Sequence, residues 1–119
     1  MKKRIFEIRM FFTTRKNEYW MLVSSKENSV TNRSGCVGLL TSPDLMTWEV
    51  QKPLYSPNID VGAHECPDLF KIGNWWYLIY STYTGFYATV YRMSKSIDGP
   101  YIIPKEKLSI HVGFMQAKQ

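Results

Sequence analysis

The sequence is poor in the residues that build disulfide frameworks, metal sites and membrane spans. It has only two cysteines and two histidines among 119 residues, and none of them stands at a spacing typical of metal ligands. No apolar run approaches the roughly 18 residues that a transmembrane helix needs. The basic start at residues 2–4 resembles that of a signal peptide, but Glu7 and Arg9 interrupt any apolar stretch after it. We therefore expect a soluble, cytoplasmic protein with reduced thiols, no metal and no membrane association.

Acidic residues are outnumbered by basic ones, 10 against 15, which gives a formal net charge of +5. Such a balance raises the question of a nucleic-acid partner. Much of the excess lies at the two ends of the chain, however, and elsewhere the basic residues are mixed with carboxylates. No nucleic-acid-binding motif accompanies them, so we expect no nucleic-acid partner.

Sustained helical periodicity is also missing, whereas short runs of aromatic and branched residues recur between turn-forming residues. Such runs are typical of β-strands. A hairpin turn is expected at 71–74, and further turns at 15–17, 42–44 and 98–100. Strands are predicted at residues 18–24, 36–41, 48–50, 75–81, 87–94 and 101–103. The sequence therefore predicts an all-β protein.

The strand pattern repeats once along the chain. Residues 19–25 match 75–81, with Trp20 and Trp76 lying 56 positions apart, and Ser42 matches Ser96 at 54 positions. Repeated units of several short strands suit the blades of a β-propeller, although two such repeats could also form an ordinary sandwich. Trp20 and Trp76 are expected to pack within the units, and Trp48 and Tyr101 between them.

The most informative motif is the segment 64–70, His-Glu-Cys-Pro-Asp-Leu-Phe. Glu65 stands just before a predicted strand, and Pro67 restricts the backbone beside it. A carboxylate held on a rigid element is suited to general acid catalysis, which requires control of both its position and its pKa. With residues 19–22 and 38–45, this segment resembles glycoside hydrolase family 32, the group of invertases, levanases and sucrose-6-phosphate hydrolases.

The resemblance implies a five-bladed β-propeller, of which this chain would form about two blades plus flanking strands. The 119 residues would be one partial catalytic domain, with blade-like units at about 5–55 and 65–105 and the start of a further blade at 106–119. In the related family 43 the acid glutamate is typically followed by Gly-Pro, so Cys66 favours family 32. Family 32 hydrolyses terminal fructosyl bonds with retention and without a cofactor, which implies sucrose, sucrose 6-phosphate or a fructan as substrate.

The resemblance also assigns roles to single residues. Glu65 would be the acid/base catalyst, with Cys66 supporting it. The family's Arg-Asp-Pro motif is expected just ahead of residue 19, where Arg9 is followed by Met10 and Phe11, so Arg9 is either a supporting remnant or a surface arginine. Nothing in the sequence matches the family's nucleophile motif, Trp-Met-Asn-Asp-Pro-Asn-Gly. His64 receives no catalytic role, and Asp68 is expected to cap the turn into its strand.

Three interpretations follow from these residues. The leading one is a β-fructosidase-type glycoside hydrolase whose 119 residues are inactive alone, because an acid/base cannot replace a missing nucleophile. The second is a non-catalytic sugar-binding relic, favoured by Met10 and Phe11. The third is one part of a split propeller, which self-associates or pairs with a complementing chain through its open strand edges. The substrate-binding residues cannot be assigned from the sequence.

Overall fold

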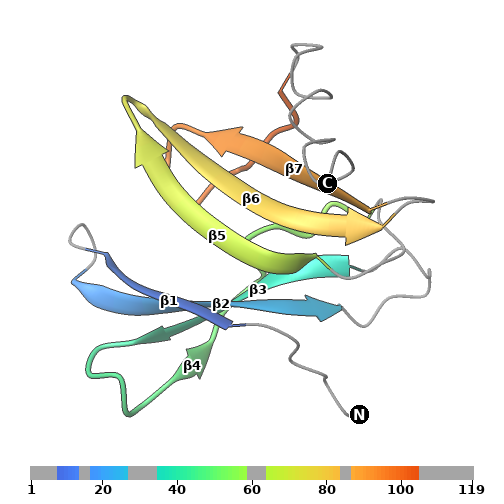
Figure 1. The fold of residues 1–119 in the computed structure, drawn as a ribbon. Helices are drawn as coiled ribbons and strands as arrows, with labels where there is room; N and C mark the ends of the chain where they lie inside the picture. Colours follow the sequence, from blue (N-terminus) through green and yellow to red (C-terminus); the bar gives the residue numbers. More distant parts are fainter. Residues whose placement is uncertain (1–7, 14–16, 27–34, 59–63, 84–86, 105–119) are drawn as a thin grey trace.

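The fold consists of two antiparallel β-sheets that face each other, as the computed structural model shows (Figure 1). The structure describes residues 8–13, 17–26, 35–58, 64–83 and 87–104. The first sheet has the order β1-β2-β3-β4 and the second the order β5-β6-β7. The strands are β1 (Ile8–Thr13), β2 (Glu18–Lys26), β3 (Gly35–Ser42), β4 (Glu49–Val50), β5 (Glu65–Ile72), β6 (Trp75–Tyr83) and β7 (Tyr87–Ser94).

Each sheet is a meander in which consecutive strands pair. β1 pairs with β2 over its full length, from Ile8 opposite Val23 to Thr13 opposite Glu18. The predicted hairpin between β5 and β6 turns on Gly73 and Asn74, with Gly73 at a φ of 60°. Glycine suits this position because a positive φ brings no Cβ clash. The predicted all-β fold is therefore confirmed.

One hydrophobic core joins the two sheets. The first sheet supplies Trp20, which is only 1% exposed, and the second sheet supplies Tyr80. Trp76 is partly buried against the same core. The remaining core residues are Leu22, Val37, Leu39, Leu54, Tyr55, Leu69, Leu78, Ile97 and Tyr101. Because both sheets contribute, neither buries its apolar face without the other.

The two repeats keep the same strand order but not a constant spacing. β2 and β6 begin at Glu18 and Trp75, whereas β3 and β7 end at Ser42 and Ser94. The connection 27–34 is longer than the connection 84–86, so the second unit is the shorter. The structural counterpart of Ser42 is therefore Ser94, not Ser96, and the hydroxyl oxygens of both accept a backbone amide from the turn that follows.

Three strand predictions need correction. β1 is a strand that the sequence pattern does not predict. The strand expected at 101–103 is reduced to a single bridge, Met93 to Ile102, because Pro100 and Pro104 flank it and lack the amide hydrogen that a ladder needs. Glu65 is the first residue of β5 and does not precede it.

Trp48 was expected to pack between the units, and this expectation is wrong. Its side chain is only partly buried, and its indole nitrogen donates to the carbonyl of Leu45 within an exposed turn. Tyr101, expected in the same role, does lie in the core. The expected unit boundaries at 5–55 and 65–105 remain a prediction, and residues 106–119 lie outside the described part of the chain.

Candidate active site around Glu65

Glu65 stands at the bulged start of β5. It pairs with Ser81, and the register then shifts, so that Asp68 pairs with Ile79. Two residues of β5, Cys66 and Pro67, thus stand opposite one residue of β6, which is the arrangement of a β-bulge. Glu65 is half-buried, so its carboxylate is restricted without being removed from solvent.

The bulge places its two residues in different surroundings. Cys66 has a φ of 51° and an exposed side chain, whereas Pro67 is buried. A positive φ is unusual for a residue with a Cβ and costs conformational energy. Past the bulge, Asp68 accepts a hydrogen bond from the backbone amide of Leu69 at 2.8 Å. Asp68 lies inside β5, which begins at Glu65, so it does not cap a turn into the strand as the sequence predicts.

A stack of aromatic rings supports the backbone on both sides of the Glu65–Ser81 pair. His64, which is fully buried, stacks on Tyr80 with ring centroids 4.1 Å apart and on Tyr55 at 5.8 Å. His64 directly precedes Glu65, and Tyr80 directly precedes Ser81. The stack therefore restrains the backbone next to Glu65 in β5 and next to its partner Ser81 in β6.

Arg92 covers this stack from β7. Its guanidinium carbon lies 5.8 Å from the centre of the Tyr55 ring and 5.5 Å from that of Tyr80, within the range of cation–π attraction. Its Nε donates to the hydroxyl of Tyr55 at 2.8 Å, and its Nη1 to the carbonyl of Tyr91. Sequence reasoning missed this set, because the residues lie far apart along the chain.

Arg9 lies in β1, where its backbone is paired with Leu22. β1 and β5 are the first strands of their sheets and contact each other. Arg9 is the second residue of β1 and Glu65 the first of β5, so the two stand at similar places in the two sheets. Met10 and Phe11 follow Arg9 within β1. The side chains of this strand lie outside the described part, so the supporting role of Arg9 stays a prediction.

The described residues contain no group of three or more His, Cys, Asp or Glu residues that could hold a metal ion. Among the same residues, no helix is long and apolar enough to cross a membrane.

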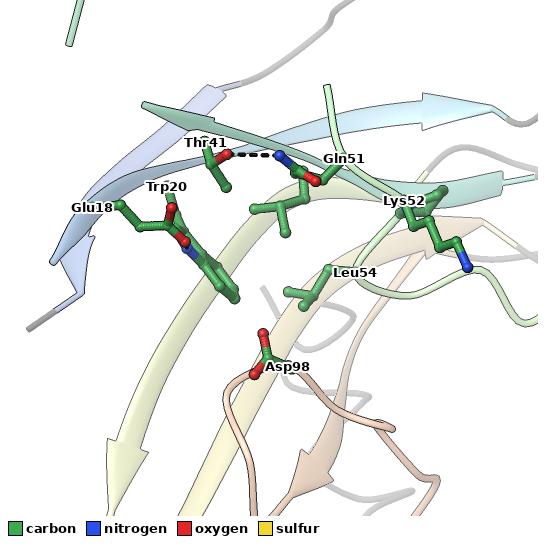
Figure 2. Close-up of a pocket in the computed structure, with 9 residues that line it drawn as sticks. Glu18, Trp20, Thr41, Gln51, Lys52, Leu54 and Asp98 are labelled. Atoms are coloured by element: carbon green, nitrogen blue, oxygen red, sulfur yellow. Dashed lines mark hydrogen bonds between the residues drawn. The ribbon is translucent and has the colours of Figure 1, made fainter. Parts of the chain in front are cut away.

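A separate cavity of about 610 Å³ lies between the first sheet and the turn after β7 (Figure 2). Its lining combines the start of β2, the end of β3, the segment 51–54 and Asp98. Glu65 is not among the lining residues. The sequence placed Glu18 in a strand and Asp98 in a turn, but it gave no sign that the two lie on one cavity.

Two ionisable groups near the turns have altered acidity. Burial raises the pKa of Tyr101, and the negative charge of Asp98 adds to this effect. The Tyr101 hydroxyl donates to the carbonyl of Ile97 at 2.8 Å. The pKa of the exposed Asp44 is lowered because its carboxylate accepts hydrogen bonds from the backbone amides of Thr47 and Met46. Asp44 therefore holds the backbone of its own turn, in the region where the sequence predicts a turn.

The two facing sheets have the fold of part of a five-bladed β-propeller, as in glycoside-active enzymes of known structure. The N-terminal domain of the glycosyl hydrolases family 32 matches residues 9–114, and the chain belongs to this family. The predicted family and the predicted fold, part of a five-bladed propeller, are thereby confirmed. No curated protein sequence matches the chain.

Several solved structures of enzymes have a similar fold. An inulosucrase from Halalkalicoccus jeotgali bound to kestose has a TM-score of 0.70 and 17% identity over 85% of this chain and 30% of its own. The GH32 β-fructofuranosidase of Bombyx mori has a TM-score of 0.62 and 25% identity over 78% of this chain and 20% of its own. A GH43 enzyme from Xanthomonas citri complexed with xylotriose has a TM-score of 0.64 at 9% identity, over 89% of this chain and 33% of its own. The chain thus spans a third or less of these proteins.

Proposed function

We propose that this chain carries the acid/base catalyst of a β-fructosidase-type glycoside hydrolase. The observation that carries the proposal is Glu65 at the bulged start of β5, in a chain that belongs to family 32. The substrates would be terminal fructosyl bonds in sucrose, sucrose 6-phosphate or fructans, cleaved with retention. The kestose-bound inulosucrase among the similar structures supports a fructoside as the ligand class. A cytoplasmic location is part of the same proposal.

Glu65 would first donate a proton to the leaving glycosidic oxygen and then remove one from the attacking water. Both steps need a carboxyl group that is held in place and can still reach the substrate. The pairing with Ser81 and the stacked rings beside it meet the first need, and half-burial meets the second. Cys66 would support Glu65 from the adjacent position, and Arg9 from the start of β1.

The 119 residues alone are proposed to be inactive, because retaining hydrolysis also needs a nucleophilic carboxylate and their sequence contains no match to the family's nucleophile motif. We expect the purified chain to release no fructose from sucrose, sucrose 6-phosphate or inulin. Fructose release that is abolished by Glu65→Gln would contradict the proposed inactivity and would show that the nucleophile is present.

A graft tests the role of Glu65 directly. The corresponding strands of the Bombyx mori β-fructofuranosidase are replaced by residues 18–104 of this chain, so that the host supplies both the nucleophile and the family's Arg-Asp-Pro motif. We expect the graft to hydrolyse sucrose, and Glu65→Gln to lower kcat about 10²–10⁴-fold, which is the usual contribution of general acid–base catalysis. The matched control is Asp68→Asn, which changes a neighbouring carboxylate and should lower kcat far less.

Two results of the graft would contradict the proposal. One is a folded graft in which Glu65→Gln retains the kcat of the unchanged graft. The other is a graft in which Asp68→Asn lowers kcat more than Glu65→Gln does. The acid/base would then be Asp68 and not Glu65.

A second candidate is a non-catalytic role, as a sugar-binding relic or as one part of a split propeller. Met10 and Phe11 favour it, because apolar side chains after Arg9 cannot replace the carboxylate of an Arg-Asp-Pro motif. The split-propeller version requires a partner, either a second copy or a complementing chain, that covers the outer strands. A graft that folds and binds sucrose but does not hydrolyse it would favour this candidate.

A further inference from the structure

The second sheet has two apolar faces, and the first sheet covers only one of them (Figure 1). Leu78 and Tyr80 of β6 point into the core between the sheets. Because side chains alternate along a strand, Tyr77 and Ile79 point to the opposite face, the outer face of the second sheet. Both are half-buried, and no strand in the described part of the chain lies over them.

Aromatic rings occupy the middle of this outer face. Phe70 of β5 lies opposite Tyr77, and its ring stacks on that of Tyr77 with centroids 5.7 Å apart. Tyr91 of β7 lies opposite Ile79, with its ring 6.0 Å from that of Tyr77. Met93, opposite Tyr77, is half-buried as well. A contiguous apolar patch of this kind is typical of a surface that binds another protein.

The register of the two repeats shows which face of the first sheet this one corresponds to. Ser42 and Ser94 are counterparts, and they pair with the residues directly before Trp20 and Tyr77, respectively. Trp20 and Tyr77 are therefore counterparts as well. Trp20 is 1% exposed, because the inner face of the first sheet packs against the second sheet. The outer face of the second sheet is thus equivalent to a face that is covered in the first.

The first sheet carries the complementary face on its own outer side. By the same register, Met21 corresponds to Leu78, which is buried between the sheets. Met21 itself points away from the core and is half-buried. Leu40 lies opposite Met21, and Val50 lies opposite Leu40, so the three form one apolar row. Val50 is 73% exposed, so this row can be reached by a partner.

We propose that the outer face of the second sheet binds the outer face of the first sheet in a second copy of this chain. These faces are the counterparts of the two that pack inside the chain, so the contact between copies repeats an interface that the fold already contains. The two sheets represent two blades of a five-bladed propeller, in which every blade has a neighbour on both sides. Because one chain carries both halves of the contact, a second copy suffices as the partner.

Such a contact is head-to-tail, and it leaves one outer face open at each end of the assembly. Copies with two sheets each cannot divide a five-bladed ring evenly, so association continues beyond the dimer. Glu65 pairs with Ser81, on the same side of β6 as Ile79. A docked copy therefore borders Glu65, but the contact itself does not depend on the role proposed for that residue.

Sedimentation velocity of the full chain tests the proposal. We expect species larger than a dimer to form as the concentration rises. Ile79→Lys places a charge in the outer face of the second sheet, and Leu40→Lys places one in the outer face of the first. Because burying an unpaired charge in an interface is costly, each should weaken association at least about a hundredfold.

Mixing the two variants identifies the surfaces that meet. Ile79→Lys retains the outer face of its first sheet, and Leu40→Lys retains that of its second sheet. An equimolar mixture should therefore form a 1:1 dimer that does not grow further, although each variant alone is monomeric. Association through strand edges, or through two identical faces, would not give this result.

The control variant is Met46→Lys, which adds the same charge at an 86% exposed position in the turn before β4. It should change the association constant by no more than about twofold. Circular dichroism checks that each variant is folded. If Ile79→Lys does not fold, Tyr91→Lys replaces it, since Tyr91 lies on the same face at the outer strand β7.

The proposal is overturned if the unchanged chain stays monomeric up to roughly 1 mM, because the partner would then be a different chain. It is also overturned if folded Ile79→Lys or Tyr91→Lys associates like the unchanged chain, or if the mixture remains monomeric. A dimer in the mixture alone supports it, whether or not Glu65 acts as an acid/base catalyst.

Discussion

At the scale of single residues, the position of Glu65 depends on side chains that it does not bond. His64 and Tyr80 stack at the two backbone positions next to the Glu65–Ser81 pair, and Arg92 covers the stack from β7. A guanidinium group suits this place, because its flat face lies over rings while its edge donates hydrogen bonds. The support of the candidate catalytic residue is therefore built from the second sheet and from the segment that carries Tyr55.

Replacing Arg92 should destabilise the chain. Arg92→Gln removes the cation over both tyrosines and the hydrogen bond to the Tyr55 hydroxyl, and should lower the free energy of unfolding by about 1–3 kcal/mol. Arg92→Lys keeps the charge but loses the planar fork, so its loss should be smaller. Urea denaturation followed by circular dichroism measures both.

The matched control for Arg92 is Lys95, whose Nζ lies 5.3 Å from the centre of the Trp75 ring at an exposed position. Lys95→Gln should cost no more than about 0.5 kcal/mol. If Arg92→Gln and Lys95→Gln lower the free energy of unfolding equally, the contacts of Arg92 with the aromatic stack contribute no more than an ordinary surface contact.

At the scale of elements, the strands and the hairpin could be predicted because their signals are local. Residues 87–94 are rich in aromatic and branched residues, which indicates a strand, and Gly73-Asn74 indicates a tight turn. β1 could not be predicted in the same way, because its assignment depends on pairing with β2. The aromatic stack and the cavity escaped prediction for a related reason. Each brings together residues from strands and turns that only the packing of two sheets makes neighbours.

The turn after β7 should make stability depend on pH in the alkaline range. The buried Tyr101 holds its proton to a higher pH in the folded chain than in the unfolded chain, where tyrosine ionises near pH 10. Its contribution to stability is therefore complete below about pH 10 and is lost as the pH rises toward the raised folded-state pKa. Tyr101→Phe should flatten this loss, and should cost about 1 kcal/mol at neutral pH through the hydrogen bond to Ile97.

Denaturation midpoints between pH 7 and pH 11 measure this effect. The control is Tyr87→Phe, since Tyr87 is 62% exposed and its replacement should leave the pH dependence unchanged. A Tyr101→Phe variant that loses stability above pH 10 as steeply as the unchanged chain would refute the assignment.

At the scale of the whole molecule, the outer strands carry apolar side chains into solvent. Val50 in β4 is 73% exposed, and Ile102 and Ile103 beside β7 are 49% and 53% exposed. Leu45 and Met46, in the turn before β4, are exposed as well. These apolar side chains lie beside the last strand of each sheet. A partner chain that pairs there could cover them.

If the split-propeller candidate holds, the chain should self-associate in a concentration-dependent manner, as measured by sedimentation velocity. Val50→Lys together with Ile103→Lys should weaken the association, because exposed edges that carry charge resist pairing. Ile72→Lys is the control, since Ile72 is equally exposed but lies next to the hairpin turn. If the chain stays monomeric at every concentration, it does not pair with a second copy, and the split-propeller candidate then requires a different, complementing chain. A folded monomer that is stable without any such chain would contradict the candidate.

The bulge at Cys66 also implies a balance between backbone strain in the folded chain and a restricted orientation of the Glu65 carboxyl group. A glycine at this position would adopt the φ of 51° without steric cost. It would, however, release the chain into many more unfolded conformations, and in the folded state it would let the carboxyl group one residue earlier sample a wider range of directions. A side chain that holds the backbone here thus trades a local strain for a narrower distribution of orientations at Glu65, which is what a proton donor requires.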